Sequence, residues 1–175
     1  MSNAGKMPDS RGTSAPVQRR EIGAWAFFDF ANSGYTTVVL TTIYSTYFVA
    51  VIGAGMEAAQ PGSATFAWTL SIGAANLLVL LCGPVIGAIA DRRASKKRFL
   101  LLSTTLCVGS TALLALAGPD QLQFAIACLI FSTIAFSIGE NLIAAFLPEI
   151  ATPDNMGRIS GYGWSLGYFG GLLTL

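Results

Sequence analysis

FAWTLSIGAANLLVLLCGPVIGAIADRRASKKR, residues 66–98, decides the fold of this chain. Its first 25 residues carry no charge, and a cluster of Lys and Arg follows at once. A helix needs about 20 apolar residues to cross the hydrocarbon core of a bilayer. The segment therefore predicts a membrane-spanning helix that ends at a basic loop.

Similar apolar stretches occur on both sides of this segment. The whole chain is 53% hydrophobic and 11% charged, against about 25% charged in soluble domains. We expect an all-α, polytopic membrane protein with spans at residues 22–55, 66–90, 98–118, 121–148 and 159–175. The last stretch stops after 17 residues, at the end of the sequence. We therefore expect a chain truncated in its fifth helix, belonging to a longer protein.

Lys and Arg gather on alternate sides of these spans. All ten lie before the first span, between the second and third, or between the fourth and fifth. Since basic loops stay in the cytoplasm, this pattern predicts a cytoplasmic N-terminus, and we expect a bacterial inner membrane. Residues 1–20 are polar and are expected to form a disordered cytoplasmic tail.

A carboxylate interrupts the start of the first span, in WAFFDFANS, residues 25–33. At helical spacing Asp29, Asn32, Ser33 and Thr36 share one face. A polar stripe on a membrane helix faces a protein interior or a water-filled cavity, which favours a solute pathway. The alternative is a helix that begins at Phe30, with Asp29 as its cap near the headgroups.

The fourth span contains a second polar pair, Glu140 and Asn141. Glu140 lies about 10 Å inside the helix end at 1.5 Å per residue, and Asp29 has a similar depth. Matched carboxylates on the first and fourth spans suggest a three-helix repeat whose equivalent helices line a cavity. We expect Glu140 to bind and release protons, which would be the coupling ion, and Asp29 to line the pathway. The alternative is that a neighbouring helix supplies hydrogen bonds to Glu140 and that this residue serves helix packing alone.

The loop after the second span carries an acidic residue where a helix ends. The helix macrodipole disfavours an anion at this end, so Asp91 needs a cationic partner. Arg158, in the next basic loop, is our candidate. The basic cluster itself is also explained by topology and by contact with anionic headgroups.

Other chemistries find little support in the sequence. The chain has no His, and its three Cys fall in different spans without ligand spacing, so we expect no metal or cofactor. We found no phosphate-binding Gly loop and no nucleophile elbow, and we expect no nucleic-acid partner and no enzyme activity. Glycines recur at packing intervals, at Gly83 and Gly87 and again at Gly163, Gly167 and Gly171.

The loop between the second and third spans resembles the signature loop of the major facilitator superfamily. Gly87, Asp91 and Arg92 match its Gly-x3-Asp-Arg pattern, whereas Ala94 and Ser95 replace its later Gly and first Arg. Residues 25–33, the AFLPEI of residues 145–150 and the GRISGYGW of residues 157–164 look like the vacuole-effluxer-like branch. The resemblance covers about residues 22–175. Fungal members of that branch export amino acids from the vacuole.

This resemblance implies a fold of twelve helices in two halves, of which the chain would supply most of the first. The missing C-terminal half would then be its partner. Gly87, Asp91, Arg92 and Arg158 would form a cytoplasmic gating latch. The implied function is secondary transport of a small polar solute, with amino acids as candidates. A lipid-modifying membrane enzyme and a non-transporting scaffold or receptor are the competing classes.

Overall fold

The computed structural model describes residues 19–93, 95–119 and 121–175. The expected tail at residues 1–20 lies outside the described residues, except for Arg19 and Arg20, which form the start of helix α1. Within the described ranges the secondary structure is helical, without strands. The expected all-α membrane architecture is therefore confirmed.

Four segments are long and apolar enough to cross a membrane. They are Arg19–Ile52, Ser63–Arg92 (α4), Lys96–Leu114 (α5) and Leu122–Ile150, which contains α6 (Leu122–Ala144) and α7 (Leu147–Ile150). A short α3, Ala54–Ala59, leads into α4. The stretch expected as a fifth span forms α8, Met156–Leu173. Its glycines and Arg158 make it less hydropathic than the four segments above.

The first span is not a regular α-helix. It consists of α1 (Arg19–Gly34), the π-helical η1 (Tyr35–Thr41), α2 (Ile43–Tyr47) and the π-helical η2 (Phe48–Ile52). Thr42 interrupts the helix with φ −120° and ψ −76°. The hydroxyl of Thr41 donates to the carbonyl oxygens of Thr36 and Thr37, both at 3.0 Å. The Thr37 carbonyl also accepts from the backbone N–H of Thr42 at 3.1 Å, so hydrogen bonding around this turn stays within the span.

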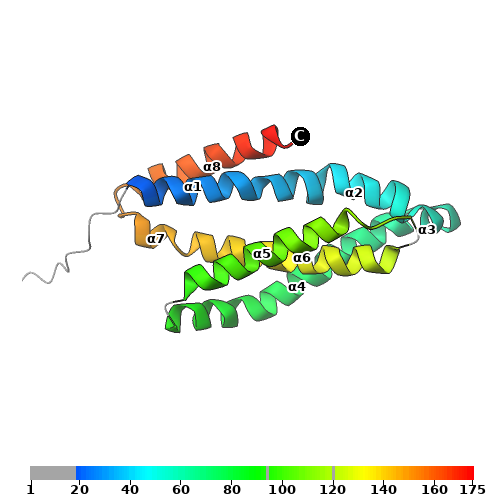
Figure 1. Ribbon diagram of the computed structural model, residues 1–175, viewed down its shortest axis with the longest axis horizontal. Helices are drawn as coiled ribbons and strands as arrows, with labels where there is room; N and C mark the ends of the chain where they lie inside the picture. The colour runs from blue at the N-terminus through cyan, green and yellow to red at the C-terminus, as the bar shows by residue number, and fades with distance from the viewer. Residues whose placement is uncertain (1–18, 94, 120) are drawn as a thin grey trace, which may run out of the picture.

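The helices form two groups, with the first span between them. Figure 1 shows α8 running alongside α1 on one side, and α4, α5 and α6 gathered on the other. A buried cluster around Phe48, Trp68 and Leu129 joins the far end of the first span to α4 and α6. The chain therefore has its packed core at the α3 end and its intramembrane carboxylates nearer the opposite end.

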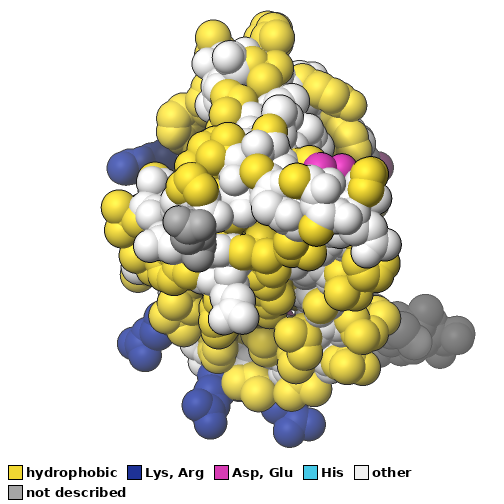
Figure 2. Space-filling view, turned by 90° about the vertical axis from the view of Figure 1, so that its right-hand side faces the viewer, with side chains coloured by type: hydrophobic (Ala, Val, Ile, Leu, Met, Phe, Trp, Pro, Cys, Tyr) yellow, Lys and Arg dark blue, Asp and Glu magenta, His cyan; other side chains and the backbone are white. Residues whose placement is uncertain are grey.

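Large apolar side chains cover the outside of the helices. Leu80 on α4 and Leu101 on α5 are 71% and 70% exposed. In Figure 2, which looks onto the α3 end, hydrophobic side chains cover most of the face, and Lys and Arg appear only at its margin. The exposed apolar side chains along the sides of α4 and α5 suit lipid rather than water, as expected for a multi-pass membrane protein.

Candidate functional site

The packing of α8 on α1 depends on glycine. A Cβ atom at Gly170 would lie 2.1 Å from the carbonyl oxygen of Phe30, and one at Gly163 would lie 2.5 Å from the Trp25 ring. A Cβ at Gly167 would lie 2.7 Å from Asp29 Oδ2. The two backbones thus approach closely, and α8 passes directly over the polar face of α1.

A hollow of about 600 Å³ opens beside this contact. We call it the α1–α8 hollow; its walls come from α1, η1, α6, α8 and the C-terminal residue. Its lining residues are Asp29, Ser33, Thr36, Thr37, Glu140, Trp164, Gly167, Tyr168, Gly171, Leu172 and Leu175. The volume falls in the range of small-molecule sites, roughly 300–1,000 Å³.

The two intramembrane carboxylates meet at this hollow. Asp29 and Glu140 both line it and are close enough for their charges to interact. The side-chain amide of Asn32 donates to the Glu140 carboxylate and so ties α1 to α6. Both carboxylates are half-buried. Two anions at one site in a low-dielectric region are costly, so this arrangement favours either a proton bound to one carboxylate or a compensating positive charge.

Two hydroxyl groups of the hollow, on Ser33 and Thr37, donate their protons within the first span. Ser33 Oγ donates to the Asp29 carbonyl at 2.9 Å, and Thr37 Oγ1 donates to the Ser33 carbonyl at 3.0 Å. Since a hydroxyl has one proton and two lone pairs, each oxygen remains available as an acceptor. Together with the carboxylates of Asp29 and Glu140, these oxygens make the first-span side of the hollow rich in hydrogen-bond acceptors.

Four of the six predicted pathway residues line the hollow together: Asp29, Ser33, Thr36 and Glu140. Asn32 faces a separate apolar pocket between α1, η1, α5 and α6 and reaches Glu140 from that side. Asn141 is exposed and lines a small pocket with Asp91 instead. The capping alternative for Asp29 is wrong, because α1 begins ten residues earlier, at Arg19.

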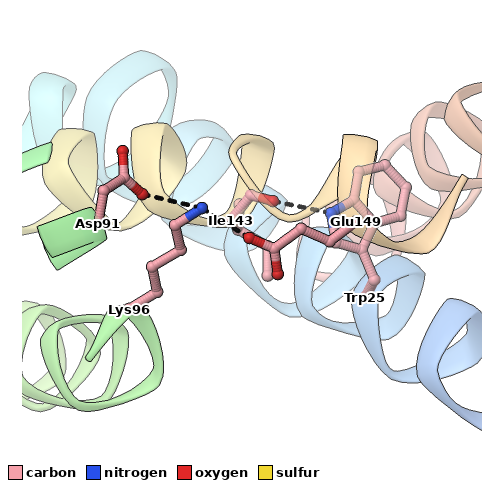
Figure 3. Close-up of polar contacts among 5 residues, drawn as sticks. All are labelled: Trp25, Asp91, Lys96, Ile143 and Glu149. Carbon is pink, nitrogen blue, oxygen red and sulfur yellow. Dashed lines mark hydrogen bonds and ion pairs between the residues drawn. The ribbon is translucent and has the colours of Figure 1, made fainter. Parts of the chain in front are cut away.

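A second polar cluster lies where α4, α5 and α7 meet. Lys96 Nζ lies 2.9 Å from Asp91 Oδ1 and 2.7 Å from Glu149 Oε1 (Figure 3). It also lies 5.9 Å from the centre of the Phe146 ring. Asp91 is near the C-terminal end of α4 and Lys96 is at the N-terminal end of α5, so each charge is unfavourable for the dipole of its own helix. The ion pair between them compensates both unfavourable interactions.

The predicted pairing of Asp91 with Arg158 is not what the structure shows. The short loop between α4 and α5 places Lys96 next to Asp91. Both described ion pairs in this region therefore involve Lys96 and not Arg158. Arg92, the last residue of α4, and Arg158, in α8, are exposed. Helix α4 continues through Gly87, where an added Cβ would meet nothing within 4 Å, so the packing of the described residues does not require glycine there.

Trp25 connects the two polar regions. Its Nε1 donates to the Ile143 carbonyl at 2.9 Å, near the end of α6 (Figure 3). This bond fixes the start of α1 against the segment that leads to Glu149. The α1–α8 hollow and the Lys96 cluster are thus joined by packed helix rather than by a flexible loop.

Comparison with known proteins decides the family. The model of the Major Facilitator Superfamily matches residues 7–175. The chain belongs to the major facilitator superfamily. It is 30% identical over 152 residues to YxiO of Bacillus subtilis (strain 168), an uncharacterized MFS-type transporter. That match covers 86% of this chain and 35% of the relative, and no solved structure matches.

In this major facilitator chain, three polar or aromatic residues of the hollow went unnoticed in the sequence: Thr37, Trp164 and Tyr168. Thr37 lies four residues after Ser33 and eight after Asp29, so helical spacing by itself places it on the polar face of the first span. Trp164 and Tyr168 are four residues apart on α8, with Gly167 between them. Two aromatic residues at helical spacing beside a row of glycines were the sequence signal that could have pointed to this side of α8.

The described part of this chain holds no group of three or more His, Cys, Asp or Glu side chains suited to a metal ion. Cys82, Cys107 and Cys128 are free thiols on three different helices. The lining of the hollow itself contains carboxylates, hydroxyl groups and aromatic rings.

Proposed function

We propose that this chain is the N-terminal part of a longer secondary transporter that moves a small polar solute across a bacterial cell membrane. Amino acids are the first candidates, in line with the resemblance of residues 25–33, 145–150 and 157–164 to the vacuole-effluxer-like branch. The chain spans about a third of the length of its curated relative. A lipid bilayer and the remaining part of the same protein are the partners of this proposal.

One observation carries the proposal: two carboxylates from separate helices share a hollow in a chain that is otherwise strongly apolar. Ionisable groups within membrane spans are costly and usually mark solute or proton pathways. The Asn32–Glu140 bond alone would be explained by packing. Asp29 on the same hollow, with acceptor oxygens around it, favours a pathway.

Protons are the proposed coupling ion. Glu140 is held by Asn32 and lies close to Asp29, so binding of a proton there would change the charge of the hollow directly. Asp29 lies against α8 and lines the hollow without a tie to a third helix. We assign Glu140 to proton exchange and Asp29 to contact with the solute.

The loop between α4 and α5 is proposed as a gating latch on the cytoplasmic side. Asp91 is held there through Lys96 to Glu149, so the loop and α7 move together. Arg92 and Arg158 are exposed and therefore free to contact the rest of the protein. The orientation follows from the loops that carry Lys and Arg.

The test is transport by the full-length protein in proteoliposomes. A mixture of the twenty ¹⁴C-labelled amino acids is offered with and without an imposed pH gradient. We expect accumulation that depends on the gradient and is lost when a protonophore is added. Flux without gradient dependence contradicts proton coupling. Absence of any flux, with the protein folded, contradicts the amino-acid proposal and favours a non-transporting scaffold or a lipid-modifying enzyme.

A further inference from the structure

We propose that the α1–α8 hollow binds a protonated amine. This inference rests on the proposed transport function and names the substrate class of the same site. The solute would place its ammonium group between Asp29 and Glu140 and its apolar body beside the rings of α8. The inference stands on the charge, the hydrogen-bonding character and the aromatic content of the lining.

The charge of the hollow has one sign. Asp29 and Glu140 are the charged residues among those that line it, and no Lys, Arg or His takes part. A buried charge without a counter-charge is strongly unfavourable. A cationic solute supplies that counter-charge directly, a neutral solute leaves it to a bound proton, and an anionic solute adds a further like charge.

The hydrogen-bonding groups of the hollow are complementary to a donor. Ser33 and Thr37 direct their hydroxyl protons to backbone carbonyls of the first span. The amide of Asn32 donates to Glu140. The α1 and α6 walls therefore offer carboxylate oxygens and hydroxyl lone pairs, while Thr36, Trp164 and Tyr168 add polar groups that can also donate. An ammonium group has three donors and no acceptor, so it matches this lining.

Aromatic rings distinguish an organic amine from an inorganic cation. Trp164 and Tyr168 line the hollow, with ring centres 6.2 Å apart, and are 66% and 72% exposed. Trp and Tyr faces attract ammonium groups within about 6 Å. Hard metal cations instead require six or more oxygen ligands. Gly167, between the two rings, lets Asp29 lie against the same stretch of α8.

The hollow also has room for the apolar part of such a solute. Its volume is about 600 Å³, and Leu172 and Leu175 extend the lining beyond the aromatic pair. Small-molecule sites of this kind combine a mostly apolar wall with a few polar groups that fix orientation. An amine with a compact apolar body fits both parts.

Three probes with the same phenyl ring and similar chain length test the inference. Binding of tritiated phenethylamine to the full-length protein in nanodiscs is measured, and 2-phenylethanol and 3-phenylpropionate compete with it. We expect saturable phenethylamine binding, and at least about tenfold weaker binding of the neutral and anionic compounds. No saturable binding of phenethylamine, or equal binding of the neutral compound, overturns the inference.

Variants locate the site. Asp29→Asn and Glu140→Gln should each weaken phenethylamine binding by about tenfold or more, whereas Asp154→Asn, at an exposed carboxylate outside the hollow, should not. Trp164→Leu should weaken it about threefold to tenfold, and Phe169→Leu, on α8 but outside the lining, should not. Unchanged binding in Asp29→Asn and Glu140→Gln overturns the inference. If a variant elutes as an aggregate, the selectivity of the unaltered protein among the three probes still decides.

The binding assay needs no gradient, so its failure differs from failure of the transport proposal. Phenethylamine binding without gradient-driven flux upholds the amine site and contradicts transport. Gradient-driven flux of an anionic or uncharged solute, without phenethylamine binding, upholds transport and overturns the amine site.

Discussion

The side-chain amide of Asn32 on α1 donates a hydrogen bond to the carboxylate of Glu140 on α6, 108 residues further along the chain. This bond joins the two helix groups at the depth where Asp29 enters the same hollow. It fixes one oxygen of Glu140 and leaves the carboxylate beside the α1–α8 hollow. The predictions below follow from this arrangement and from the packing around it.

Asn32→Ala removes the described donor to Glu140. Hydrogen bonds to charged groups are worth about 1.5–3 kcal/mol, so we expect at least a tenfold loss of proton-coupled uptake in the full-length protein. The initial uptake rate in proteoliposomes measures it. Asn32→Gln keeps an amide and should recover part of the activity. Full activity in Asn32→Ala would show that the bond is dispensable.

Gly170→Ala should separate α8 from α1. The new Cβ would lie 2.1 Å from the Phe30 carbonyl oxygen, and overpacking of this kind costs about 1–3 kcal/mol. We expect a lower melting temperature in detergent. Gly161→Ala, on the same helix, meets nothing within 4 Å and should be neutral or slightly stabilising. Equal melting temperatures for the two variants would contradict the close approach of the helices.

Lys96→Gln should impair transport more than Lys97→Gln or Arg158→Gln. Lys96 is the cation that bridges Asp91 and Glu149, whereas Lys97 and Arg158 are exposed. Uptake rates at equal membrane expression measure the effect. A larger defect in Arg158→Gln would restore the pairing of Asp91 with Arg158 that the sequence suggested, in a conformation other than this one.

The positive-inside pattern predicts which loops face the cytoplasm. In a background with Cys82, Cys107 and Cys128 replaced by Ser, Gln60→Cys should react with a membrane-impermeant maleimide in intact cells. Lys97→Cys should react only after the cells are permeabilised. Both residues are exposed on the protein surface, so a difference in labelling reports the side of the membrane and not burial. The reverse labelling would invert the proposed topology.

The helical architecture could be predicted because hydropathy and length alone require it. The segment at residues 66–98, for example, forms α4 and the start of α5 as its uncharged run and basic loop indicated. The polar face of α1 could also be predicted, since Asp29, Ser33 and Thr36 are spaced as neighbours on one side of a helix.

Other features depend on information that the sequence carries only weakly. The change to π-helical turns at Tyr35 is one of them, because no local residue pattern indicates it. Asp91 was correctly expected to need a cation, but the choice between Lys96 and Arg158 depends on loop geometry. Asn141 follows Glu140 directly, and a step of one residue turns it about a quarter of the way around α6, away from the hollow.

Glu140→Gln in the full-length protein tests the central claim most directly. The substitution mimics a permanently protonated carboxyl while preserving its size. We measure accumulation of the ¹⁴C amino-acid mixture against an imposed pH gradient, and counterflow exchange of the same mixture without a gradient. The account predicts that gradient-driven accumulation is abolished, whereas exchange persists once the solute concentration is raised to offset the weaker binding that loss of the Glu140 charge causes. Accumulation equal to that of the unaltered protein would contradict proton coupling through Glu140 and would leave that carboxylate with a packing role.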